Sequence, residues 1–467
     1  MVFSSLAFIF VFLPIVLVFY HISPFKYKNI ILLGFSVLFY TLGEPKYILL
    51  IIISMMINYI LSILMYNNRN DKEKKNMILF TIVLFNIGIL IFFKYYSFLI
   101  DNINIIFNSN LRVKEISLPL GISFYTFQLI SYIVDVYRGK IIPQRNIIKF
   151  SLYVLMFPQL VAGPIVVYSD IEKQIDNRKI TLIKFGQGVE RFIIGLGKKV
   201  IIANNLGIIW SEVKLVNQSN LSLLSAWIGI IAFTLQIYFD FSGYSDMAIG
   251  LGKMFGFDFL ENFNLPYISK SITEFWRRWH ISLGSWFKEY LYIPLGGNRR
   301  GELIQLRNII IVWFTTGLWH GASWNFIVWG LYFGSVLYLE KTFFKKLLKR
   351  LPGRICNLYT MLIVVIGWVF FDFENISVAI DYIKVMFGFG SINVDNLGMY
   401  LLRTNIILII ISIMLATGFF DNTLEKMKKF FKLKDLTLIL FIKFIIFIIS
   451  ISYLVSESYN PFLYFRF

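Results

Sequence analysis

Apolar residues occur along this chain in long stretches that short polar loops separate. A helix that crosses a bilayer needs about 20 consecutive residues of this kind. The first stretch, 3–20, lacks both a basic leader and a small-residue cleavage site, so it predicts a retained helix and not a signal peptide. Further stretches lie at 29–43, 46–65, 77–93, 117–137, 149–168, 181–208, 221–251, 308–339, 358–372, 400–420 and 436–456. The pattern predicts an all-α polytopic membrane protein with about eleven transmembrane helices.

Two of these stretches are poor continuous spans. Pro158 and Pro164 interrupt the stretch 149–168, while three glycines and two aspartates punctuate the stretch 221–251. Non-helical backbone at membrane depth is tolerated only where protein or a water-filled cavity covers it. We therefore expect re-entrant or interfacial helices around a central tunnel, within a single membrane domain over residues 1–467.

Basic residues gather in loops that follow alternate stretches, at 69–75, 138–149, 341–354 and 426–434. The loop between the second and third stretches holds only Glu44, Pro45 and Lys46. Because Lys and Arg are retained on the cytoplasmic side, the basic clusters are predicted to face the cytoplasm and the N-terminus the outside. This predicts a multi-pass protein of the cell membrane, surrounded by lipid.

Composition supports the membrane prediction. Hydrophobic residues make up 57% of the chain and charged residues 15%, against roughly 25% charged residues in soluble domains. A soluble enzyme, a disordered chain and a fibrous protein are excluded. The net charge of +18 is explained by the orienting loops, so we expect no nucleic-acid partner. With one cysteine and three histidines, the chain has no disulfide framework and no metal site with zinc spacing.

The segment 271–301 is the first that could carry chemistry. At helical spacing, one stripe contains Trp276, His280, Leu283, Phe287 and Tyr290, and Pro294 with the glycines after it ends the helix. One interpretation is an interfacial anchor in which His280 is only packed. The other is that His280, Arg277 and Arg278 line the cytoplasmic mouth of a site for an anionic ligand.

The segment 307–330 places His320 near the middle of an apolar stretch that is long for one span and short for two. An ionisable residue at membrane depth is costly and is a functional candidate by default. A neutral imidazole could serve there as a general base, or it could make a helix–helix hydrogen bond. Asn325 could orient the imidazole, bind a carbonyl, or be a packing amide. Asp240 could orient a histidine, or be structural if it lies beside an arginine.

The two histidine segments resemble the membrane-bound O-acyltransferase family. The resemblance rests on Phe-Trp-Arg-Arg-Trp-His at 275–280 together with Leu-Trp-His-Gly-Ala-Ser-Trp-Asn at 318–325. The closer likeness is to the bacterial branch that acetylates polysaccharides such as alginate. Supporting segments lie at 1–5, 118–127, 157–164, 238–246, 294–299 and 460–467.

The resemblance implies a helical fold with a tunnel, in which His320 matches the family's catalytic histidine and His280 its second, cytoplasm-facing histidine. It implies transfer of an acyl group, most plainly acetyl, from a cytosolic thioester to an extracytoplasmic hydroxyl. Acetyl-CoA would be the donor substrate, with no bound cofactor. The acceptor would be an extracytoplasmic acetyltransferase- or esterase-like partner protein, or a cell-surface polysaccharide.

Two other functions stay open at this point. A related enzyme of the same family would move D-alanine toward teichoic acid. A transporter or flippase for a glycan would also hold buried polar residues, and inverted repeats would favour it, but the sequence shows none.

Overall fold

The computed structural model describes residues 2–114, 116–160, 163–299, 301–389, 392–419 and 436–456. Every regular element within these ranges is helical, so the predicted all-α class is confirmed. Among the described residues, six helices are long and apolar enough to cross a membrane, namely Ile48–Asn67, Lys72–Phe107, Leu182–Lys214, Leu223–Met254, Gly353–Asp372 and Asn396–Ala416. Shorter apolar helices cover Phe8–Ile22 and Leu440–Ser456. The polytopic architecture is supported, whereas the count of about eleven spans stays a prediction.

The chain forms two compact units. The first comprises Met1–Phe192 and Ser245–Leu260, and the second comprises Ile193–Tyr244 and Glu261–Phe467.

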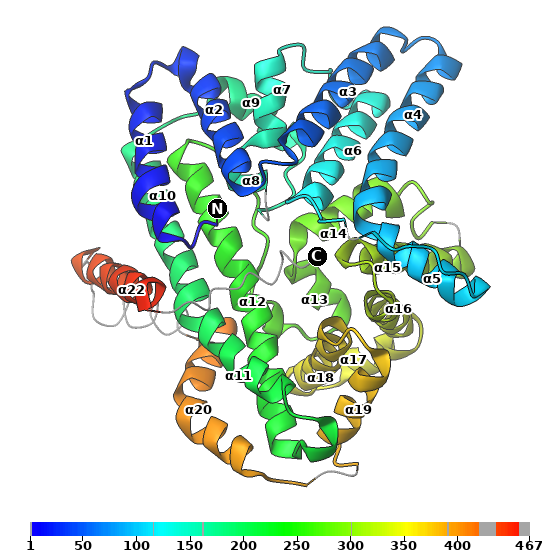
Figure 1. The fold of residues 1–467 in the computed structure, drawn as a ribbon, viewed down its shortest axis with the longest axis vertical. Helices are drawn as coiled ribbons and strands as arrows, with labels where there is room; N and C mark the ends of the chain where they lie inside the picture. The colour runs from blue at the N-terminus through cyan, green and yellow to red at the C-terminus, as the bar shows by residue number, and fades with distance from the viewer. Residues whose placement is uncertain are drawn as a thin grey trace. The chain divides into compact units, whose positions relative to one another are not determined.

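The first unit contains the helices drawn in blue and cyan in Figure 1. They are η1 (Phe8–Phe12), α1 (Leu13–Ile22), α2 (Phe25–Gly43), α3 (Ile48–Asn67), α4 (Lys72–Leu90), η2 (Ile91–Tyr95), α5 (Tyr96–Phe107), α6 (Ile122–Arg138), α7 (Ile147–Leu155), α8 (Phe157–Leu160), α9 (Tyr168–Asn177) and most of α10 (Leu182–Gly197). The stretch with Pro158 and Pro164 is broken, as predicted, because α7 ends at Leu155 and α8 has a single turn.

Two buried cations cap helix ends in this unit. Lys28, which lies within α2, donates an Nζ hydrogen to the carbonyl oxygen of Tyr20 at 2.6 Å. Arg178 donates through Nε to the carbonyl oxygen of Phe255 at 3.1 Å, and the Tyr20 hydroxyl donates to the same oxygen at 2.6 Å. Positive charge at a helix C-terminus complements the helix dipole, so these cations stabilise the ends of α1 and of the helix that precedes Phe255.

The second unit contains η3 (Lys198–Ala203), α11 (Asn204–Lys214), η4 (Gln218–Asn220), most of α12 (Leu223–Met254), η5 (Pro266–Ile268), α13 (Ile272–Arg278), α14 (Ile281–Phe287), η6 (Lys288–Tyr292), α15 (Glu302–His320), α16 (Trp324–Leu339), η7 (Glu340–Phe344), α17 (Lys345–Arg350), α18 (Gly353–Asp372), α19 (Ile376–Met386), α20 (Asn396–Ala416) and α22 (Leu436–Ser456). Its core is rich in aromatic side chains contributed by α12, α13, α16 and α18. The basic segment 426–434 and the motif at 460–467 lie outside the described residues.

The apolar stretch 308–339 forms a helical hairpin, α15 and α16, with a turn after His320. Gly317 and Gly330 let the two backbones touch, since a Cβ at Gly317 would strike the carbonyl of Phe326 and one at Gly330 the carbonyl of Trp313. The absence of side chains at these two positions therefore fixes the place of His320 at the end of the hairpin.

Nearly all of the stretch 221–251 lies in α12, a continuous helix of 32 residues, so the expectation of a broken span there was wrong. Its glycines serve close packing instead. A Cβ on Gly243 would lie 2.7 Å from the carbonyl oxygen of Gly195, which means that the segment after Ile193 packs directly against the α12 backbone.

Candidate active site

The helix expected over 271–293 breaks at His280. The chain forms α13 up to Arg278 and starts α14 at Ile281, while His280 itself takes the left-handed conformation with φ 45° and ψ 55°. The prediction of one continuous helix, with His280 in a stripe along its face, was therefore wrong. This conformation costs a residue with a Cβ roughly 1–2 kcal/mol. Such residues persist where the surrounding structure imposes them, and they cluster at functional sites.

An extended segment that precedes α13 imposes this conformation. The backbone N–H of Asn264 donates to the carbonyl oxygen of Arg278 at 2.9 Å, and the N–H of Ile281 donates to the carbonyl oxygen of Asn262 at 2.9 Å. The ring of Phe241, from α12, lies edge-on to the imidazole with centroids 4.7 Å apart. Backbone hydrogen bonds thus hold the chain both before and after His280, and the Phe241 ring packs against its imidazole.

The imidazole of His280 is buried, with 2% of the residue exposed. Its Nδ1 lies 3.1 Å from the side-chain oxygen of Asn262. Burial lowers the pKa of His280 to about 3, so the ring is neutral at physiological pH.

His320 is the last residue of α15 and is also buried, with 4% exposed. Three aromatic rings meet its imidazole at steep angles. The ring centroids lie 4.9 Å away for Trp329, 5.0 Å for Trp319 and 5.3 Å for Phe371. These rings place the imidazole of His320 in surroundings of low polarity.

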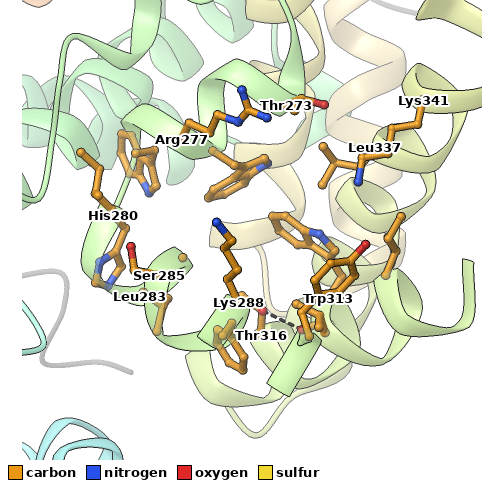
Figure 2. Close-up of a pocket in the computed structure, with 18 of the residues that line it drawn as sticks. Thr273, Arg277, His280, Leu283, Ser285, Lys288, Trp313, Thr316, Leu337 and Lys341 are labelled. Carbon is orange, nitrogen blue, oxygen red and sulfur yellow. Dashed lines mark hydrogen bonds between the residues drawn. The ribbon is translucent and has the colours of Figure 1, made fainter. Parts of the chain in front are cut away.

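Both histidines line one cavity of about 660 Å³. The Trp319 ring connects them, with centroids 5.0 Å from His320 and 6.0 Å from His280. Figure 2 shows Lys288 projecting between His280 on one side and Trp313 on the other. A volume of this size is typical of ligand sites. The structure therefore brings together two residues that lie forty positions apart in the sequence.

The cavity is cationic. Arg277 from α13, Lys288 from η6 and Lys341 from η7 line it, and none of its described lining residues is Asp or Glu. Burial and then the charge of Arg277 lower the pKa of Lys341. Cations that repel one another without a carboxylate between them favour the binding of an anion.

The side chain of Arg278, in contrast, is not among those that line the cavity. It pairs with Glu274 at 2.9 Å and donates to the carbonyl oxygen of Asn264 at 3.0 Å. Of the two arginines expected at the mouth of an anion site, the structure therefore places only Arg277 there.

Asp240 and Asn325 take part in the scaffold of the site. Asp240 forms an ion pair with Lys199 at 2.6 Å, and each side chain is 2% exposed. This arrangement resembles the structural role considered for Asp240, except that its partner is a lysine and not an arginine. The Asn325 amide donates to the carbonyl oxygens of Phe370 and Phe371, both at 3.2 Å. Since Phe371 contacts His320, the amide binds carbonyls and thereby holds a wall of the histidine pocket.

Sequence reasoning missed three groups of this site. Lys341 was assigned only to a cytoplasmic loop cluster, and Lys288 received no role. Glu340 received no role, although its buried carboxylate accepts from the backbone N–H of Ile272 at 2.7 Å and of Thr273 at 3.0 Å. It anchors the start of α13 beside Lys341. No local sequence signal marks such a contact, because the partners lie 68 residues apart.

Comparison with known proteins agrees with this geometry. The family model described as MBOAT, membrane-bound O-acyltransferase family, matches residues 141–378, which include both histidines. The chain belongs to the membrane-bound O-acyltransferase family. The prediction of an acyltransferase, made from the two histidine motifs, is thereby confirmed.

Individual relatives are similar over most of their length. The chain is 38% identical to the probable alginate O-acetylase AlgI of Pseudomonas putida, with 100% of both chains covered. It is 35% identical to the peptidoglycan O-acetyltransferase of Helicobacter pylori, over 90% of this chain and 87% of that protein. The likeness to the teichoic acid D-alanyltransferase of Bacillus subtilis is lower, at 28% over 53% of this chain and 65% of that protein.

Proposed function

We propose that this membrane acyltransferase moves an acetyl group from acetyl-CoA, on the cytoplasmic side, to a hydroxyl group on the other side of the membrane. The observation that carries the proposal is that the two motif histidines meet in one cavity with three cations. O-acetyl transfer is also the activity in the names of the more similar relatives, whereas the D-alanyl relative matches about half of the chain.

In this mechanism His320 removes the proton of the attacking hydroxyl as its oxygen bonds to the thioester carbon. The carbon–sulfur bond then breaks, and the same imidazole returns the proton to the leaving thiolate. The aromatic walls around His320 exclude water, which disfavours hydrolysis of the thioester. Holding donor and acceptor in one cavity supplies further acceleration.

The cations support acetyl-CoA over a carrier-bound thioester as the donor. Coenzyme A carries a pyrophosphate and a further phosphate, whereas a carrier-bound arm has one phosphodiester. Arg277, Lys288 and Lys341 offer three positive groups to match the larger charge. Acetyl-CoA is thus a substrate of the site and not a resident cofactor.

On the far side, we propose a polysaccharide hydroxyl, or a hydroxyl of an extracytoplasmic partner protein that passes the acetyl group on, as the acceptor. The names of the relatives point to cell-surface glycans as a class. The direct test is to supply acetyl-CoA together with a cell-surface glycan acceptor to purified protein and to measure the release of free thiol. A transporter or flippase would release none.

Arg277→Ala should raise the KM for acetyl-CoA roughly tenfold or more while leaving protein abundance unchanged, since a charge-assisted hydrogen bond contributes about 1.5–3 kcal/mol. Arg278→Ala is the matched control, because this neighbouring arginine pairs with Glu274 outside the cavity lining. The measurement is the KM for acetyl-CoA of both variants in steady-state kinetics. Equal effects on KM in the two variants would contradict the placement of the donor phosphates.

We also propose a multi-pass topology in the cell membrane, with about eleven spans and the N-terminus outside. The basic segments 72–75, 341–354 and 426–434 then face the cytoplasm. Cysteines introduced into these segments should resist an impermeant thiol reagent in intact cells and react once the cells are opened. Labelling of any segment in intact cells would refute the orientation at that loop.

A further inference from the structure

We infer that Asn262 is a positioning residue that fixes His280 in one tautomer, with the proton on Nδ1 and the lone pair on Nε2, the nitrogen through which the ring accepts a hydrogen bond or proton from bound substrate. The inference rests on the proposed function for the identity of that substrate. It adds a residue and a proton position to the site that neither motif contains.

The contacts of the Asn262 side chain determine the orientation of its amide group. Its side-chain oxygen accepts from the backbone N–H of Ser282 at 3.2 Å and from the Ser282 hydroxyl at 2.9 Å. A backbone N–H can only donate, so the atom that faces it must be the oxygen and not the amide nitrogen. The amide orientation follows from the backbone.

The orientation of the Asn262 amide determines which nitrogen of the His280 imidazole carries the proton. The same oxygen lies 3.1 Å from Nδ1 of His280. An amide oxygen has no hydrogen to give, so Nδ1 must carry the proton and donate it. In a neutral ring the lone pair then resides on Nε2. Both residues are buried, at 1% exposed for Asn262 and 2% for His280, so water does not compete for this hydrogen bond.

Asn262 holds both the backbone and the ring of His280 in place. Asn262 also holds the chain on the far side of His280, because its carbonyl oxygen accepts from the N–H of Ile281 at 2.9 Å. One residue therefore fixes the left-handed backbone of His280 through its main chain and the tautomer through its side chain. Metal- and substrate-facing histidines commonly need such a partner to keep one nitrogen available. Since His280 lines the cavity, a fixed tautomer has a direct use there.

The test compares three variants in the thiol-release assay. Asn262→Ala should lower kcat tenfold to a hundredfold and change the donor KM less than twofold, because the ring loses its fixed tautomer while the cations remain. Asn264→Ala is the control: it removes an exposed side chain two positions along the same segment, leaves the backbone bond from Asn264 to Arg278 in place, and should behave like wild type. If the activity per amount of folded Asn262→Ala protein equals that of wild type, the inference is wrong.

Asn262→Asp provides the conservative variant. The carboxylate keeps an acceptor oxygen for Nδ1, so much of kcat should return. A negative charge beside the imidazole favours its protonated form, which cannot accept through Nε2. The acidic limb of the kcat–pH profile should therefore move to higher pH than in wild type. A purely structural role would leave the limb in place, and that result would overturn the inference.

A spectroscopic readout separates this inference from the proposed function. The chain has three histidines, so ¹⁵N-histidine labelling gives few signals, and His280→Gln identifies that of His280. The inference predicts a neutral Nδ1–H tautomer at physiological pH in wild type, and a mixture in Asn262→Ala. An Nε2–H tautomer in wild type would refute it. The predicted tautomer in a protein that releases no thiol would instead count against the proposed function alone.

Discussion

His320→Ala should abolish acetylation of the acceptor while the protein remains in the membrane at near wild-type abundance. General-base catalysis contributes about 10²–10⁴-fold, so the loss should be close to complete in cells. The measurement is the ester content of the cell-surface polymer, normalised to the amount of protein detected in membranes.

His320→Gln separates a base from a packing group. Glutamine retains a polar group that can hydrogen-bond between helices, so a structural role of His320 would largely survive the change. Proton transfer would not survive, because an amide is no base near neutral pH. Substantial activity in the glutamine variant at normal abundance would require the catalytic assignment to be given up.

His280→Ala should lower kcat by roughly 10²-fold, at the lower end of the range for a group that accepts a proton or hydrogen bond. Alanine is also strained in the left-handed backbone conformation of this position. His280→Asn is therefore the matched variant, because asparagine tolerates that conformation. Both variants should be similarly impaired in the thiol-release assay. If His280→Asn approached wild-type activity, the residue would be a turn former and not part of the site.

The helical membrane architecture could be predicted from the sequence because it depends on the total hydrophobicity of long stretches and not on single contacts. Twenty-residue apolar stretches specify membrane helices whatever their neighbours do, and prolines stop α7 where expected. His320 was identifiable as a candidate because an ionisable residue within an apolar stretch carries a cost that function or pairing has to offset.

The details of the site depend on contacts between distant segments, which no local pattern reports. Helical spacing in 271–293 could not reveal the left-handed turn at His280, because the bonds that impose it come from Asn262 and Asn264. Adjacent arginines look equivalent in the sequence, yet Glu274 holds one and the cavity takes the other. The glycines of 221–251 similarly suggested a break, whereas Gly243 serves a helix contact.

The most direct test of the whole account uses inverted membrane vesicles that contain this protein and its native acceptor. Acetyl-CoA with a labelled acetyl group is added to the exposed cytoplasmic face. The account predicts that label appears on the enclosed side as an alkali-labile ester, with one free thiol released outside for each acetyl group, and that His320→Gln vesicles show neither. Intact acetyl-CoA inside the vesicles, or labelled ester without release of thiol, would contradict it.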